Sequence, residues 1–418
     1  MAEPNKVLVK RVVELGGREA TVLEHSCLRV MIDDIGSMVP ELSFAVGRQR
    51  LNAHWLPWFR SNSGKPYCEN EDGAFWKANL LYNLAGNFPC IPNFGGGHVV
   101  DGVDMPAHGW TANLAWHFCS GGTDEETGTG WALSTMESPS AAMPLSFKKI
   151  DALIPGQNVH YTSISVKNRG SADLEICAGW HNTVGAPFLA EGCRISGASS
   201  AWATAPKGSE FDNTTRLAIA AEFSSLAEAP LNAGGKTDLS RVPGPIGYTD
   251  FAVGRIDSSV SLGWSSVVNP ALKAAYLCFF PGPASAAEDD IIFRFNDLWM
   301  QYGGRPFTPW ASYEGGTDLT YCLGTENSIS AYAMGLEYAR QIRTLLGAPT
   351  TVIIPAGKQK VIRYGTLFAP YEGSALDNGI SSVEADSGIV ADCGSAGHLR
   401  FAADPSFVVL KELEKRVG

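Results

Sequence analysis

The stretch His160-Tyr-Thr-Ser-Ile-Ser-Val166, followed by Leu174-Glu-Ile-Cys-Ala-Gly179, indicates the type of structure that this chain forms. Residues that favour strands recur in both runs, and the segment between them, Lys167–Asp173, contains Asn, Gly, Ser and Asp, which favour turns. Short strands separated by turns are typical of a protein built mainly from β-sheets.

The same pattern continues in both directions along the chain. Further strands are predicted at 7–14, 20–23, 28–32, 38–46, 217–223, 259–264, 274–280, 291–295, 321–324, 351–354 and 359–370. The 45 Gly and 24 Pro residues are spread along the chain, which favours many turns between short strands.

Helices are predicted to be few. Ser330–Leu346 has apolar residues at helical spacing, and Gly347 supplies a stop signal. A second helix is expected over Val408–Val417, with Asp404 as a cap and Pro405 in the first turn.

The 418 residues show no tandem repeat and no low-complexity linker, so we expect a single domain over 1–418. Two segments, 49–79 and 191–248, read as long loops or insertions. Loops of that length in a compact domain often form the walls of a functional site.

Charge and composition exclude several partners. The net charge is −11 and Lys and Arg form no long run, so nucleic acid is not an expected partner. No apolar stretch reaches 18 residues, so no membrane span is expected. Met1–Gly17 lacks the apolar core of an export signal, and the nine Cys include no CxxC pair. We therefore expect reduced, buried thiols and a cytoplasmic protein, either a monomer or a homodimer.

Common cofactor and metal motifs are missing from the sequence. It contains no GxGxxG after a strand, no P-loop, no GxSxG and no HExxH, and no two His residues are four positions apart. We expect neither a cofactor nor a metal.

Three stretches combine residue types suited to catalysis. The first runs from Gly86 through Pro89, Pro92 and Phe94 to His98, and then continues through Pro106-Ala-His-Gly-Trp110 to Trp116. The second is Gly179-Trp-His-Asn-Thr183, with His181 expected near a strand end. The third is Tyr321-Cys-Leu-Gly-Thr-Glu-Asn327, where a strand runs into Glu326 just before the predicted helix. Alone, each has an ordinary structural reading, such as a core histidine or an acid at a helix start.

In their order along the chain, these stretches resemble the galactose mutarotase-like superfamily, the aldose 1-epimerases, and are most similar to the hexose-6-phosphate mutarotase branch. The resemblance extends from about residue 28 to 370. It implies a large antiparallel β-sandwich (a supersandwich) with few short helices, and an isomerase that interconverts the anomers of a hexose or hexose derivative.

The reaction requires two proton transfers, because the anomeric hydroxyl loses a proton while the ring oxygen gains one. A carboxylate suits the first transfer and an imidazolium the second. By the resemblance, Glu326 is the general base, His181 the general acid and His108 an assisting donor. Sugars also need aromatic faces and amide or charged hydrogen-bond partners. The candidates for substrate binding are Asn93, His98, Trp110, Asn182, Asp250, Trp299 and Arg305.

Two other functions stay open. The chain could be a carbohydrate-binding or sensing protein on the same scaffold without turnover, because a fold does not guarantee a function. It could also be a related sugar lyase or hydrolase. A hydrolase needs a second carboxylate beside Glu326, for which Glu314 and Asp318 are the candidates.

Overall fold

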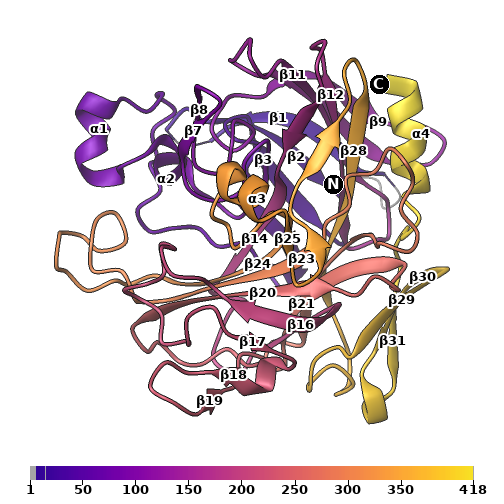
Figure 1. Ribbon diagram of the computed structural model, residues 1–418. Coiled ribbons are helices and arrows are strands. Elements are labelled where there is room, and N and C mark those ends of the chain that lie inside the picture. The colour runs from indigo at the N-terminus through magenta and orange to yellow at the C-terminus, as the bar shows by residue number, and fades with distance from the viewer. Residues whose placement is uncertain (1–5, 15, 418) are drawn as a thin grey trace.

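The computed structural model describes residues 6–14 and 16–417 (Figure 1). The described chain is mainly β, with antiparallel sheets and few helices, which confirms the predicted fold class. Helices α1 and α2 lie on one side of the molecule, and α4 lies on the other (Figure 1). The helices are α1 (Glu69–Trp76), α2 (Asn79–Asn83), α3 (Leu336–Ile342) and α4 (Val408–Val417), with short 3₁₀ turns η1 (Leu226–Glu228) and η2 (Gly394–Ala396).

Two large sheets form the centre. In spatial order, the eight-stranded sheet contains β15 (Arg194–Gly197), β21 (Leu262–Asn269), β22 (Ala274–Pro281), β28 (Gln359–Pro370), β12 (Val159–Asn168), β11 (Leu145–Leu153), β10 (Gly130–Glu137) and β9 (His117–Thr123). The seven-stranded sheet contains β17 (Glu222–Phe223), β16 (Ser199–Thr204), β20 (Tyr248–Ile256), β23 (Phe295–Tyr302), β24 (Tyr321–Ile329), β14 (Ala178–Gly185) and β6 (Asn87–Cys90).

Smaller sheets surround these two. Near the N-terminus, β1 (Leu8–Val13), β2 (Glu19–Glu24), β3 (Arg29–Asp33), β4 (Glu41–Val46) and β5 (Gln49–Asn52) pair in sequence order. Three strands pair near the C-terminus: β29 (Ser382–Asp386), β30 (Gly388–Asp392) and β31 (His398–Phe401). The two-stranded pairs are β7 (His98–Val100) with β8 (Val103–Met105), β13 (Leu174–Ile176) with β27 (Val352–Ile354), β18 (Ala229–Pro230) with β19 (Lys236–Thr237), and β25 (Thr344–Leu345) with β26 (Ala348–Pro349).

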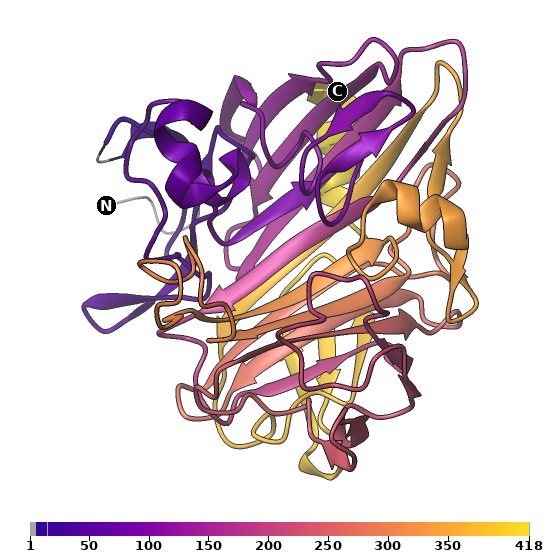
Figure 2. The ribbon, with the colours of Figure 1, turned by 60° about the vertical axis from the view of Figure 1, so that its left-hand side comes forward.

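The long strands of the seven-stranded sheet run side by side (Figure 2), and both of their faces are covered. Every residue of β14 is buried, as is nearly all of β24. Because side chains alternate between the two faces of a strand, even-numbered residues of β14 point to the opposite face from odd-numbered ones.

One face of this sheet meets the eight-stranded sheet through buried polar groups. Asn182 donates from Nδ2 to the Tyr364 hydroxyl and accepts from the Tyr276 hydroxyl at 3.2 Å. Asn327, on the adjacent strand β24 and in the same layer, accepts from the Tyr364 hydroxyl and donates to Asn296. These side chains satisfy one another between the sheets, so the opposite face of β14 and β24 is the one left for a site.

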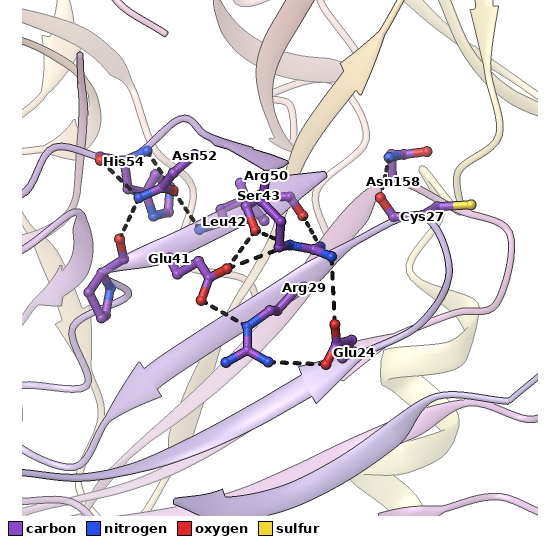
Figure 3. Close-up of polar contacts among 11 residues, drawn as sticks. Glu24, Cys27, Arg29, Glu41, Leu42, Ser43, Arg50, Asn52, His54 and Asn158 are labelled. Carbon is purple, nitrogen blue, oxygen red and sulfur yellow. Dashed lines mark hydrogen bonds and ion pairs between the residues drawn. The ribbon is translucent and has the colours of Figure 1, made fainter. Parts of the chain in front are cut away.

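The N-terminal sheet carries a closed set of ion pairs (Figure 3). Arg29 contacts Glu24 at 3.0 Å and Glu41 at 2.9 Å, and Arg50 approaches the same two carboxylates at 3.6 and 3.7 Å. Ser43 completes the set by donating to Glu41 and accepting from Arg50. Each charge therefore has two opposite neighbours, which ties together β2 to β5.

Several predicted elements differ from the structure. The helix predicted at 330–346 is shortened to α3, because Tyr332 and Ala333 have positive φ angles and Arg343 ends it in the left-handed region. The expected strand 217–223 is reduced to β17, since Ala220 has a φ of 51°. The expected strand 291–295 is largely replaced by loop, and β23 begins only at Phe295. The segment 49–79 contains β5, α1 and the start of α2.

Two further findings concern the general predictions. All nine cysteines are free thiols, but Cys119 is exposed and Cys27 and Cys68 are partly exposed, so the expectation that all are buried is wrong for these three. In the part of the chain that is described, no helix has the length and apolar character needed to cross a membrane.

Candidate active site

His108, His181 and Glu326 meet in the wall of one cavity of about 180 Å³. The Nε2 atom of His181 lies 3.1 Å from Oε1 of Glu326. The ring of His108 stands nearly perpendicular to that of His181, with their centroids 4.9 Å apart. Residues that are 218 positions apart at the extremes of the sequence therefore share one site.

Strand register brings the pair together. His181 lies opposite Phe88 of β6, and Glu326 lies opposite Asp297 of β23. Residues paired in this way point to the same face of the sheet. Phe88 stacks on the His181 ring at 4.5 Å, which orients the imidazole toward β24. Both His181 and Glu326 lie inside strands, so the predicted positions at a strand end and just before a helix are wrong.

The glycine two residues before the carboxylate has a steric role. Gly324 and Glu326 share a face of β24, and a Cβ on Gly324 would lie 2.6 Å from Oε1 of Glu326. It would also meet the Trp299 side chain at 3.1 Å. A side chain at position 324 would therefore displace the carboxyl group, and glycine leaves it room.

His108 lies on a turn with an unusual backbone. Its φ is 59° and that of Gly109 is 73°. The backbone N–H of His108 donates to Gly95, and the Asn113 side chain donates to the carbonyls of Ala107 and Gly109, both at 2.7 Å. Such a conformation is uncommon in a non-glycine residue and persists where surrounding bonds hold it, as they do here.

Four polar atoms in the cavity wall lack hydrogen-bond partners among the described residues. They belong to Glu326 (Oε1), His108 (Nδ1), Trp299 (Nε1) and Arg305 (Nη2). The 3.1 Å approach of His181 to Glu326 is not aligned as a hydrogen bond, which leaves Oε1 unpaired. Buried polar groups are nearly always hydrogen-bonded, so four that lack such a bond around one cavity indicate a site for a polar ligand, although Arg305 Nη2 also approaches Glu210 at 3.4 Å.

Burial sets the protonation of the pair. It raises the pKa of Glu326 well above its ordinary value, and the nearby Asp297 and Glu210 carboxylates raise it further. Burial also lowers the pKa of His181 well below its ordinary value, with a smaller contribution from His108. The Glu326 carboxyl therefore keeps its proton to a higher pH than an ordinary glutamate, and the His181 imidazole stays neutral to a lower pH than an ordinary histidine.

Aromatic and apolar side chains form the rest of the cavity. Trp299 and Trp310 flank the Arg305 guanidinium, whose carbon lies 4.7 Å from the Trp310 ring centre. Phe211 stacks on Phe251 at 4.8 Å. Leu80, Leu81 and Leu84 of the α2 region also line the cavity.

Comparison with solved structures identifies the fold of this chain. The chain is similar to a provisionally assigned aldose 1-epimerase from Klebsiella pneumoniae, with a TM-score of 0.61, 13% identity, and 87% of this chain and 83% of the other covered. It is also similar to a galactose mutarotase-like protein from Clostridium acetobutylicum, with a TM-score of 0.57, 11% identity, and 88% and 99% covered. The fold is that of the galactose mutarotase-like proteins.

A third structure agrees with this assignment of the fold. It is a provisionally assigned aldose 1-epimerase from Escherichia coli, with a TM-score of 0.51, 15% identity, and 85% of this chain and all of the other covered. No protein-family model matches the sequence, and neither does any curated protein. The comparison of solved structures thus supports the fold that the order of the sequence motifs predicted.

On this mutarotase-like scaffold, two of the seven predicted substrate-binding residues line the cavity: Trp299 and Arg305. The other five lie elsewhere. Asn93 donates to the carbonyls of Gly96 and Pro106 and accepts from Leu336, and Trp110 is buried in the core. Both have structural roles that sequence alone did not separate from binding.

The remaining three, His98, Asn182 and Asp250, are likewise not part of the cavity lining. His98 bonds to Gly96 and accepts from the N–H of Glu337. Asn182 faces the eight-stranded sheet, on the opposite face of β14 from His181. Asp250 is paired with Arg216 at 2.8 Å. The alternation of side chains along β20 puts its neighbour Phe251 in the cavity wall instead.

Sequence reasoning missed Glu210, Phe211, Phe251 and Trp310, which also line the cavity. Glu210 and Phe211 belong to the segment 191–248, and Ala78 in the wall belongs to 49–79, so both long segments contribute to the site. In the sequence, the length of these two segments was the one feature that indicated a role in the site. Glu210 reaches Arg305 at 3.4 Å while 60% of its side chain is exposed, so a ligand could take its place on the guanidinium.

The carboxylates proposed for a hydrolase do not line this cavity. Glu314 accepts from Thr308 and pairs with Lys77 at 3.2 Å, and Asp318 accepts from Gln301 and from the N–H of Arg305. Among the described residues, no group of three or more His, Cys, Asp or Glu side chains is placed to hold a metal ion.

Proposed function

We propose that this protein is a sugar mutarotase, an aldose 1-epimerase-like isomerase that interconverts the anomers of a hexose or hexose derivative. The observation that carries the proposal is the set of unpaired polar atoms around the His181–Glu326 pair in a cavity walled by aromatic rings. Sugar hydroxyls supply the missing partners, and the aromatic faces suit the C–H side of a pyranose ring.

The number of protons that the Glu326–His181 pair carries suits ring opening. The reaction needs one group that is free to take the proton of the anomeric hydroxyl and another that is loaded to protonate the ring oxygen. One proton shared between Glu326 and His181 meets this need. Hydrogen bonds from substrate hydroxyls stabilise the carboxylate, so in the complex Glu326 acts as the base and the His181 imidazolium as the acid.

The other groups have supporting roles. His108, held close to His181, donates to the carbonyl oxygen that develops when the ring opens. Arg305 and Trp299 bind and orient hydroxyl groups, with the indole and guanidinium N–H groups as donors. The names of the similar structures, which include aldose 1-epimerases and a galactose mutarotase-like protein, support the same reaction class.

Polarimetry tests the proposal. The optical rotation of freshly dissolved α-glucose, α-galactose and their 6-phosphates is followed with wild type, Glu326→Gln and Glu314→Gln. We expect wild type and Glu314→Gln to accelerate equilibration, and Glu326→Gln to lose roughly 100-fold or more of the acceleration. Equal acceleration by wild type and Glu326→Gln contradicts the assignment of the base.

The same samples separate the two other functions. Sugar binding in calorimetry without any acceleration would identify a non-catalytic binding protein. Release of new reducing ends from an oligosaccharide would identify a hydrolase.

A further inference from the structure

A second and larger cavity, of about 690 Å³, lies on the other side of α2. Leu80 and Leu81 of this helix face the candidate active site, whereas Asn79 and Asn83 line the second cavity. Its remaining walls come from the β1–β2 turn, the end of β3, the loop at 63–67 and the segment 113–116. None of the site residues assigned above is needed to form it.

One buried carboxyl group in this wall has an unused oxygen. Asp33 is 2% exposed, and its Oδ2 accepts from the Arg60 guanidinium. Its Oδ1 has no hydrogen-bond partner among the described residues. Burial and the neighbouring Glu14 raise the pKa of Asp33, to about 7, against the opposing effect of Arg60. A carboxyl group in this state both accepts from and donates to a hydroxyl, and the unpaired oxygen is available to a ligand.

The buried cation of the wall, Arg18, is already engaged by the protein. Arg18 donates from Nε and Nη2 to the carbonyl of Ser61 and from Nη1 to Asn83. Asp34, also in the wall, is paired with Arg11 at 2.6 Å. The donors of the buried Arg18 are thus taken by protein acceptors, while Lys65, the other cation of the lining, is exposed to solvent. Asp33, with its pKa of about 7 and its contact to Arg60, is a weak partner for a cation.

The other lining groups fit a hydroxyl-rich ligand. Asn79 and Asn83 bring side-chain amides to the wall, Asn113 also lines it, and Tyr67 and Trp116 bring aromatic rings. Asn79 donates to the backbone of Asn113, and Asn83 donates to Asn79, so the amides form a rigid row before any ligand arrives. Amides, one carboxyl group and aromatic faces form the combination that binds sugars.

We infer that this second cavity is a binding site for a neutral sugar unit, separate from the candidate active site. The inference does not depend on the reaction proposed above, because no residue of the His181–Glu326 site takes part. The two cavities are nevertheless linked through Asn113. This residue lines the second cavity, and its side chain donates to the carbonyls of Ala107 and Gly109, the neighbours of His108 in the first site.

Equilibrium dialysis with radiolabelled glucose tests the inference through a variant that fills the cavity. Ala115 is exposed and lines the cavity, so Ala115→Trp blocks it without disturbing the buried network. His117→Trp is the matched control, because His117 is also exposed, lies two residues further on and is outside the lining. We expect Ala115→Trp to lose one equivalent of bound glucose relative to wild type and to His117→Trp.

Tyr67→Ala is a second variant for the case in which Ala115→Trp does not fold. Loss of its aromatic face is expected to weaken this binding by roughly tenfold. Competition with unlabelled maltose, galactose, glucosamine and glucuronate reports the ligand class, and the neutral sugars should displace the label best.

The outcomes separate this site from the first one. One outcome is that wild type fails to accelerate mutarotation and still binds one equivalent of glucose that Ala115→Trp no longer binds. In that case the second site stands and the proposed function fails. Unchanged glucose binding in both Ala115→Trp and Tyr67→Ala would overturn the inference, as would preferential displacement by glucosamine or glucuronate.

Discussion

Asp297 lies directly opposite Glu326 on the neighbouring strands β23 and β24, and both carboxyl groups are buried on the same face of the sheet. Ser328 donates to Oδ2 of Asp297, while Oδ1 has no hydrogen-bond partner among the described residues. Burial raises the pKa of Asp297 to about 7, and its charge in turn raises the pKa of Glu326. The two groups therefore titrate as interacting neighbours.

Removal of the Asp297 charge should change the pH dependence of catalysis. In Asp297→Asn, the pKa of Glu326 loses a contribution that raises it, so the His181–Glu326 pair gives up its proton at a lower pH. We expect the alkaline limb of the kcat/KM profile to move to lower pH, while the acid limb stays in place. An alkaline limb that is unchanged from wild type would mean that Asp297 does not act on Glu326.

The acid limb of the wild-type profile is predicted to lie well below pH 6.5. Burial lowers the pKa of both His181 and His108, so the site gains a second proton only in acidic solution. Initial rates of mutarotation measured across the pH range test this expectation. A limb near the ordinary histidine value would show that the imidazoles are hydrated in the working enzyme.

Burial of Glu326 is expected to lower the free energy of unfolding of the protein at neutral and alkaline pH. Its pKa is higher in the folded than in the unfolded chain, so unfolding releases a proton and the free energy of unfolding falls as the pH rises above the unfolded value. Glu326→Gln removes this cost. We expect the variant to be more stable than wild type in urea at pH 8, with a smaller gain at pH 5. The reverse order of the two gains would contradict the raised pKa.

A methyl group at position 324 should impair catalysis. In Gly324→Ala the new Cβ would approach Oε1 of Glu326 to 2.6 Å, so the carboxyl group must move. Since a displacement of about 1 Å can cost on the order of 100-fold in rate, we expect a loss of that size in kcat. Gly122→Ala is the control, because a Cβ there meets nothing within 4 Å and Gly122 also lies on a strand. Equal rates for the two variants would exclude this steric role.

The ion pairs of the N-terminal sheet should contribute measurably to stability. Glu41 contacts Arg29 and approaches Arg50, and its side chain is 21% exposed. Glu41→Gln is expected to lower the free energy of unfolding by about 1 kcal/mol at low salt and by less at 1 M salt. Glu228→Gln breaks the exposed pair with Lys236 and is expected to have almost no effect. A loss that does not depend on salt would indicate a packing effect.

The sequence predicted the fold class from local signals, and it predicted the meeting of His108, His181 and Glu326 through the resemblance of three motifs to a known family. Strand residues between turns mark the sheets, and the three short motifs keep their order along the chain. The positions of these residues within their strands were harder to predict. His181, Asn182 and Thr183 interrupt the apolar pattern, so β14 was expected to end where its buried polar stretch begins.

The residues that line the cavity were harder still to predict, because residue type does not reveal the direction of a side chain. Asn182 and Asp250 adjoin residues of the cavity wall, His181 and Phe251, but point to the other face. Glu210 lies in a long segment without a motif, and only the folded chain brings it to Arg305. These positions follow from pairing between strands distant in sequence.

The opposed faces of β14 and β24 restrict how this protein can change. Moving either strand by one position would send the imidazole or the carboxyl group into the layer between the sheets and turn Asn182 or Asn327 outward. Insertions and deletions should therefore be tolerated in the loops that carry Glu210, Arg305 and Trp310 but not in these two strands. Under the proposed function, new specificities would then arise by exchange of the loops over an unaltered His181–Glu326 pair.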